Sequence, residues 1–308
     1  EVFKLNQSLL LSIIDRGPVT NDPELRRMID ASRPLSGNKG RCLVTGREDT
    51  ITALEPPVKG VRGANSSGAS LVSVNNKITN GTNGGAVPAF ASFMKEQGNN
   101  SPIGKTASFA YTTALNHLLG KESQQKLQVA DATTIFWSEK VTSLENDVFF
   151  FFSDPPKDDP DRNTEAVKTL YDSIWNGSYI VPDDSTRFYV LGLSPNSARI
   201  AVRFWHVGTV QGIGDRLKQH VEDLSIVHST KTDSALPMRR LLRSIAAQEK
   251  DDNIPPNIAG ETMRAILDGT PYPATFIQAV LRRIRAEQAK KNKKSGKPEP
   301  NVSYERAS

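Results

Sequence analysis

The chain has 308 residues, of which 37% are apolar and 24% charged, as expected for a folded protein of one large or two modest domains. Its 39 Lys and Arg against 34 Asp and Glu leave a net charge of +5, so cations indicate a polyanionic partner only where they cluster. No apolar run approaches the ~20 residues of a membrane helix, and the single cysteine, Cys42, excludes an internal disulfide and a multi-cysteine zinc site. We therefore expect a cytoplasmic protein with no membrane contact.

The first 235 residues are predicted to form a mixed α/β domain. Residues 1–34 have the apolar spacing of a helical pair. Because the sequence begins with Glu1 and shows no signal peptide, we expect an N-terminal part of the full protein to precede it. The next elements are expected at 41–45, 69–74 and 129–137 for strands, 75–85 for a glycine- and asparagine-rich loop, and 105–119 for a helix.

The second half of this domain follows an acidic, proline-rich segment near 153–164. That segment predicts a surface linker, because proline fits neither a helix interior nor a central strand. A helix is expected at 165–175. Residues 187–207 then have the pattern of an antiparallel hairpin with its turn at 194–196, and a helix is expected at 214–224.

Residues 236–308 predict a helical C-terminal domain with a basic tail. The segment 238–245 has apolar residues on one helix face and arginines on the other, and further helices are expected at 259–267 and 273–294. The last of these carries an apolar stripe formed by Ile277, Val280, Leu281 and Ile284. The predicted fold class is α+β, a mixed α/β domain with short antiparallel strands followed by a C-terminal helical bundle.

The most informative local pattern is the glycine-rich run at 59–75, K-G-V-R-G-A-N-S-S-G-A-S-L-V-S-V-N. Glycine permits positive φ, successive N–H groups in such a turn can bind an anion, and the run also contains two cations. The side chains expected to hold a phosphate–sugar backbone are Lys59, Arg62, Asn65, Ser66 and Ser67. A turn leading into a buried strand at 69–74 explains the same glycines equally well.

Several sequence blocks occur together and in order. They are C-L-V-T-G at 42–46, G-V-R-G-A-N-S-S-G-A-S-L-V-S at 60–73, K-E-Q-G at 95–98, F-A-Y-T-T-A-L-N-H-L-L at 109–119, and D-A-T-T-I-F-W at 131–137. With the hairpin run at 188–205 they resemble the Cas-eight family, subtype c, the large subunit of the type I-C CRISPR surveillance complex. The resemblance is continuous over about 41–227 and looser toward the end.

This resemblance implies a non-catalytic subunit without a cofactor in an RNA-guided antiviral complex. Such a subunit holds the 5′ handle of the guide RNA (crRNA), helps to recognise the PAM in target double-stranded DNA and steadies the displaced strand. Its implied protein partners are the handle-capping, backbone and small subunits and a helicase–nuclease recruited after target binding. Base pairing would supply most sequence specificity, while the protein reads the short flanking motif and the backbone.

Four more groups of residues are candidate nucleic-acid contacts. They are Lys95, Gln97, Asn99 and Lys105 in and after an amide-rich loop; Arg199 and Arg203 on one face of a strand; Arg239, Arg240 and Arg243 on a helix; and Arg282 and Arg283 at the start of the terminal basic run. Each group has a plainer explanation as an ordinary turn or a solvated charged face. Aromatic pairs at 136–137 and 204–205 are candidate stacking surfaces for bases, although strand aromatics are more often core.

Catalytic signals are weak, and we expect no catalytic or metal-binding residues. The four histidines have no metal-ligand spacing. A metal-independent ribonuclease that trims guide RNA is the alternative, with His117 or His220 as general base and Lys59 and Arg62 stabilising the transition state. His220 with Glu222 and Asp223 forms either an acid–base or metal cluster or, more simply, a polar helix end. A purely structural subunit is the third possibility.

Overall fold

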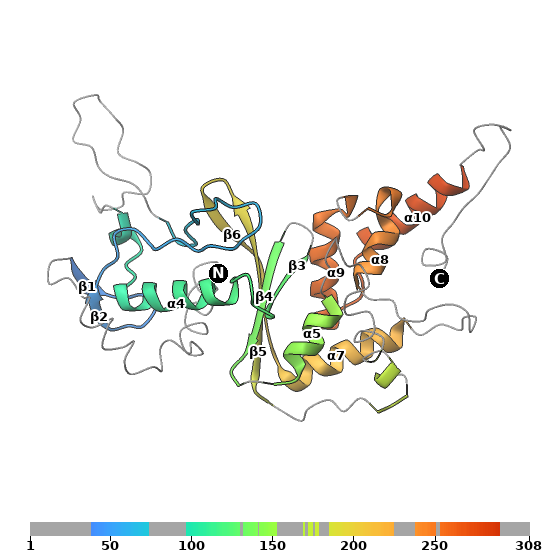
Figure 1. Ribbon diagram of the computed structural model, residues 1–308, viewed down its shortest axis with the longest axis horizontal. Coiled ribbons are helices and arrows are strands. Elements are labelled where there is room, and N and C mark those ends of the chain that lie inside the picture. The colour runs from blue at the N-terminus through green and yellow to red at the C-terminus, as the bar shows by residue number, and fades with distance from the viewer. Residues whose placement is uncertain are drawn as a thin grey trace. The chain divides into compact units, whose positions relative to one another are not determined.

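The computed structural model describes residues 38–73, 97–129, 132–140, 142–152, 169, 172–174, 176–178, 185–224, 238–250 and 253–289. The chain divides into two compact units (Figure 1). Unit 1 comprises the residues up to Ser123 together with 193–205, and unit 2 comprises 124–192 and 206–308. The fold is α+β, as predicted, with small antiparallel sheets and helices toward the C-terminal half.

Unit 1 is built around helix α4 (Lys105–Leu118), which confirms the helix predicted at 105–119. A two-stranded antiparallel ribbon, β1 (Lys39–Arg41) and β2 (Glu48–Thr50), and a short 3-10 helix, η2 (Gln97–Asn100), precede it. The side chains of Tyr111 and Leu115 on α4 are fully buried. Thr112 is also buried, and its hydroxyl is satisfied by donating to Ser108 O at 2.7 Å in the preceding turn.

A four-stranded sheet runs in the order β3 (Lys126–Val129), β4 (Ala132–Ser138), β5 (Arg187–Asn196) and β6 (Arg199–Thr209). Strands β3 and β4 pair antiparallel with Lys126 opposite Ile135, and β5 and β6 form the predicted hairpin. The tip of this hairpin, residues 193–205, belongs to unit 1, and its base belongs to unit 2.

Helices of unit 2 cover one side of its strands (Figure 1). They are α5 (Leu144–Phe152), α7 (Val210–Asp223), α8 (Met238–Ile245), the short η3 (Ala247–Glu249), α9 (Pro256–Asp268) and α10 (Ala274–Gln288). Helix α7 packs on α9, and α8 packs on α5 and α10.

Aromatic stacking fixes the sheet in the core of unit 2. Phe136 stacks on Phe188 with ring centroids 6.2 Å apart, and Trp137 stacks on Tyr189 at 5.3 Å. Phe136 and Trp137 are at most 1% exposed, and Phe204 on the hairpin is also buried. These three rings are therefore core residues, in line with the plainer explanation of the aromatic pairs. The fourth ring, Trp205, is half-buried.

Two predicted strands are wrong. The run 41–45 is mostly a turn, because β1 ends at Arg41 and the Cys42 N–H donates to Arg47 O at 2.8 Å. The run 69–74, as far as it is described, contains only single bridges at its first two residues. In both runs the conformation is set by hydrogen bonds to residues outside the run. The sequence of the run itself does not show these bonds.

Several predicted boundaries also shift. The strand predicted at 129–137 begins at Ala132, because Val129 ends the neighbouring strand β3 and pairs with Ala132. The hairpin turn lies at Ser197, whose φ is 52°, rather than at 194–196, because β5 continues to Asn196. Helix α7 begins at Val210 rather than at 214, because the Thr209 hydroxyl caps it by accepting the Gly212 N–H at 3.0 Å.

The apolar stripe expected on the last helix is not its buried face. Ile277 and Leu281 are 55% and 49% exposed and Val280 and Ile284 are half-buried, whereas Ala279 and Glu287 are buried. The Glu287 carboxylate tolerates this burial because it is paired with Arg283 at 3.1 Å. The buried face of this helix therefore includes a carboxylate paired with a half-buried arginine, which apolar periodicity does not predict.

Several predictions fall outside the described residues. They are the helical pair at 1–34, the loop at 75–85, Lys95, the linker at 153–164, most of the helix at 165–175, the domain boundary at 235/236 and the basic tail beyond 289. These stay predictions. Among the described residues, no helix is both long enough and apolar enough to cross a membrane.

Candidate nucleic-acid interface

The glycine-rich run forms a closed loop, residues 58–69, which we call the glycine loop. Val58 and Ala69 close it by exchanging two backbone hydrogen bonds of 2.9 Å each. Val58, Val61 and Ala69 turn inward and are buried. The five polar residues predicted as backbone contacts lie outside this apolar cluster, and all five are exposed. Burial of the apolar residues therefore turns the polar ones toward solvent.

Glycines at three positions make this loop possible. Gly60, Gly63 and Gly68 have φ of 88°, 79° and 100°, as the sequence predicted. At Gly60 an added Cβ would lie 3.0 Å from Leu119 Cβ and closer still to the Leu119 carbonyl oxygen. The turn is tightened by Asn65, whose side-chain oxygen accepts the Ser67 N–H at 3.2 Å. The Asn65 amide therefore shapes the loop.

The hairpin tip lies beside the glycine loop in unit 1. Ser70, just after the loop, forms a parallel bridge with Arg199, and the Ile200 N–H donates to Ser70 O at 3.1 Å. A Cβ on Gly63 would lie 3.3 Å from Pro195 Cγ at the tip. Two groups of candidates from distant parts of the sequence are thus brought together, with Arg199 next to the loop that carries two cations.

The two arginines of the hairpin share an exposed face, as predicted. Arg199 and Arg203 are exposed, while Ile200 and Phe204, on the opposite face of β6, are buried. Alternation along a strand places residues four apart on the same side. Unit 1 therefore carries exposed cations both on the glycine loop and on the neighbouring hairpin tip.

The polar groups of the loop before α4 are partly used in hydrogen bonds within the protein. Gln97 and Asn99 are half-buried, and Asn99 Oδ1 accepts from Asn38 Nδ2 at 2.7 Å. Asp49 Oδ2 accepts the Thr106 N–H in the first turn of α4 at 3.1 Å. The helix N-terminus, a candidate anion site with Lys105, is therefore already satisfied by a carboxylate of the protein itself.

The arginines of unit 2 are less exposed than predicted. Arg239, Arg240 and Arg243 on α8 are half-buried, and Arg243 Nε donates to Glu249 O at 3.0 Å, which ties the helix to the turn after it. On α10 the ion pair with Glu287 occupies Arg283, while Arg282 is exposed. Of these five arginines, Arg282 has the solvent-facing position that a backbone contact requires.

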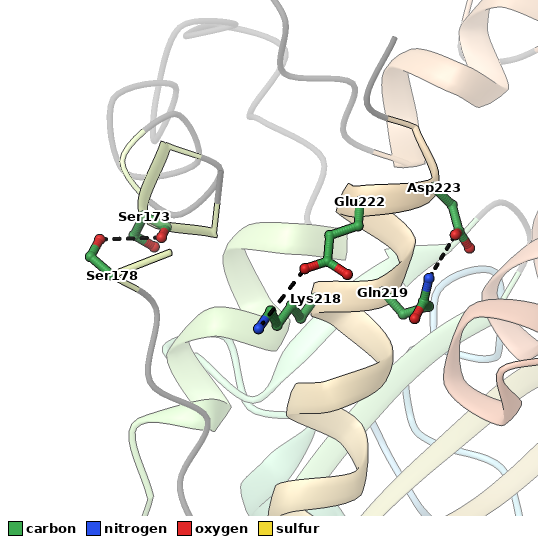
Figure 2. Close-up of polar contacts among 6 residues, drawn as sticks. All are labelled: Ser173, Ser178, Lys218, Gln219, Glu222 and Asp223. Atoms are coloured by element: carbon green, nitrogen blue, oxygen red, sulfur yellow. Dashed lines mark hydrogen bonds and ion pairs between the residues drawn. The ribbon is translucent and has the colours of Figure 1, made fainter. Parts of the chain in front are cut away.

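The cluster considered around His220 does not form. His220 is 3% exposed, its Nδ1 lies 2.5 Å from the Tyr272 hydroxyl, and burial lowers its pKa to about 4. Glu222 and Asp223 pair along their own helix instead, with Lys218 at 3.9 Å and Gln219 at 2.7 Å (Figure 2).

The histidines therefore give little support for catalysis. Because His220 is buried against Phe151 and Tyr272, it has no surface from which to act on RNA. His117 is exposed near the end of α4. Within the described ranges, no three His, Cys, Asp or Glu side chains gather as a metal site.

Sequence reasoning missed two polar residues, Glu55 and Asn116, whose hydrogen bonds join α4 to the glycine loop and to the segment before it. Glu55 accepts hydrogen bonds from the Ser108 hydroxyl and, at 2.8 Å, from the Tyr111 hydroxyl, and burial raises the pKa of its carboxyl group. Asn116 on α4 accepts the Lys59 N–H at 2.7 Å. Neither contact leaves a signal in the sequence, because each joins segments more than fifty residues apart.

Comparison with known proteins gives one family. The family described as CRISPR-associated protein (Cas_Csd1) matches residues 3–308 of the chain. No curated protein matches the chain.

Proposed function

Because this chain belongs to the CRISPR-associated Cas_Csd1 family, we propose that it is the non-catalytic large subunit of a type I-C RNA-guided DNA surveillance complex. In this role it contacts the guide-RNA handle, the PAM-proximal target duplex and the displaced strand in antiviral defence. Its protein partners in the proposal are the handle-capping, backbone and small subunits and a recruited helicase–nuclease. The family membership supports a place in a CRISPR effector complex, and the finer role rests on the surface of unit 1.

The observation that carries the proposal is the joining of the glycine loop to the hairpin tip. The bridge between Ser70 and Arg199 gathers the exposed cations Lys59, Arg62, Arg199 and Arg203 within one unit, although they come from two distant segments. Lysine and arginine that replace counterions on a phosphate backbone supply most sequence-independent affinity for nucleic acid. Small hydroxyls and glycines in the same loop allow the protein backbone to come close to the sugar–phosphate chain.

The test is binding by the assembled complex to PAM-bearing and PAM-scrambled duplex DNA over a salt series. The variant carries Lys59→Ala and Arg62→Ala, and its matched control carries Lys39→Ala and Arg47→Ala, two exposed cations of the β1–β2 ribbon. Removal of one phosphate contact should flatten the slope of log affinity against log salt by about 0.9. We expect this slope to become shallower by about 2 in the loop variant and by much less in the control.

An equal slope in wild type, variant and control would remove the glycine loop from the interface. A preference for the PAM duplex that appears only in the assembled complex would support the surveillance role. Equal affinity for both duplexes, with a steep dependence on salt, would indicate a subunit that holds the nucleic-acid backbone without reading the PAM. Salt-independent assembly, with no cross-link to RNA or DNA, would favour the purely structural subunit instead.

The ribonuclease alternative now rests on His117 alone. His117 is exposed and follows Asn116, the residue that holds the Lys59 backbone, so an imidazole and the glycine loop share one end of α4. Guide-RNA cleavage that survives a chelator and disappears in His117→Ala would establish this activity. Cleavage that His117→Ala leaves intact, or no cleavage at all, would reject it.

A further inference from the structure

We propose that Asn116 is a positioning residue that holds the glycine loop in its binding conformation without touching the nucleic acid. This inference rests on the proposed function, because it concerns the same surface. Asn116 lies in the last turns of α4 and is half-buried beneath the loop. It carries no charge, and no pattern in the sequence distinguishes it.

Both ends of the Asn116 amide are used where the chain enters the loop. Its Oδ1 accepts the Lys59 N–H at 2.7 Å, and its Nδ2 donates to Pro57 O at 3.3 Å. The two bonded groups lie on either side of Val58, whose buried side chain anchors the loop. Asparagine carries a donor and an acceptor on one planar group, so a single side chain fixes two backbone groups at the point where the loop begins.

The next residue of the loop rests on the same end of the helix. Gly60 packs against the Leu119 carbonyl so closely that a side chain there would have no space. The backbone of Lys59 is therefore held between a hydrogen bond to Asn116 and this contact at Gly60. The direction in which the Lys59 side chain leaves the surface is set by α4 and not by the loop alone.

A loop held in this way gains affinity through preorganisation. A free glycine-rich loop loses much conformational entropy when it is ordered on a ligand, because glycine has the most backbone freedom to lose. In a loop that the protein already holds, the entropy is lost when the chain folds. Binding then does not have to offset this loss, so the affinity is higher. Because the Asn116 amide is bonded to the loop backbone, its contribution to binding passes through the loop.

The experiment compares Asn116→Ala with Thr113→Ala in the assembled complex, by affinity for PAM-bearing duplex DNA over a salt series. Thr113 is half-buried one turn earlier on α4 and serves as the matched control. We expect Asn116→Ala to weaken binding about 5- to 30-fold, as the removal of one or two net hydrogen bonds implies. The salt slope should stay unchanged, because the same phosphates are still contacted.

A double-mutant cycle separates positioning from general stability. If Asn116 acts through the loop cations, Asn116→Ala should have almost no further effect in a chain that already lacks the Lys59 and Arg62 side chains. A purely structural role would lower affinity equally in both backgrounds. Full additivity, or an Asn116→Ala affinity equal to that of Thr113→Ala, would overturn the inference.

Hydrogen exchange of the wild-type chain tests the same contact without any variant. The Lys59 amide should be protected in the absence of nucleic acid, because it donates to Asn116. Rapid exchange of this amide would overturn the inference even if Asn116→Ala fails to fold. If Lys59→Ala with Arg62→Ala leaves the salt slope unchanged, the proposed function of the loop fails instead, so the two failures are distinguishable.

Discussion

Substitution of Gly60 by alanine tests whether the glycine loop depends on its contact with α4. Gly60 has φ of 88° and faces the Leu119 carbonyl, and an added Cβ would also lie 3.0 Å from Leu119 Cβ. Alanine at positive φ costs about 1–2 kcal/mol. Forcing a methyl group into an occupied site adds about 1–3 kcal/mol. Gly60→Ala should therefore reduce the stability of the loop and α4 by about 2–5 kcal/mol.

Gly46→Ala is the matched control for backbone strain. Gly46 lies in the same unit with a similar φ of 70°, but nothing lies within 4 Å of its added Cβ. The control should therefore cost only the conformational part, about 1–2 kcal/mol. The difference between the two variants isolates the steric contact with Leu119.

Hydrogen exchange followed by mass spectrometry is the suitable assay, because it reports on each segment of a two-unit chain separately. Peptides covering 58–73 and α4 should lose protection in Gly60→Ala about tenfold for each 1.4 kcal/mol. Protection elsewhere in the chain should change little. Equal losses in the Gly60→Ala and Gly46→Ala variants would refute the reasoning, because backbone strain alone would then explain both.

Three further predictions concern stability. Asp49→Ala should cost about 1 kcal/mol in urea unfolding and Asp49→Asn less, because the side-chain oxygen satisfies the first turn of α4. Burial lowers the pKa of His220 to about 4, below the 6.5 of a free imidazole. The folded state therefore favours the neutral ring, and stability should fall by about 3 kcal/mol as the pH drops from 6.5 to 4, a decrease that His220→Phe should largely remove. Arg283→Ala should lower the melting temperature more than Arg282→Ala, because it leaves the buried Glu287 carboxylate without its cation; equal shifts would show that the pair contributes little.

The elements with strong local signals could be predicted from the sequence. The helix at α4, the hairpin of β5 and β6, and the apolar face of α8 all follow from periodicity over many residues. The positive φ angles of the glycine loop were predictable because glycine alone adopts them without strain.

Local reasoning failed where a contact outside the pattern decides the conformation. The run 41–45 has the composition of a strand but turns back on itself through Cys42 and Arg47. The amide-rich loop before α4 has the composition of an anion site, but Asp49 from the ribbon already occupies the helix end. In each case the competing contact comes from a residue outside the segment that carries the pattern.

Propensity and spacing within short segments were enough to predict the fold class, most helices and the positive φ angles of the glycine loop. They could not predict that the hairpin tip lies beside this loop, that Asn116 holds it, or that His220 is buried. Hydrogen bonds and burial between distant segments depend on how the whole unit packs, so they appear only in the folded chain. Spacing along the chain determines which side chains share a face of a helix or strand, and tertiary packing determines which residues that face contacts.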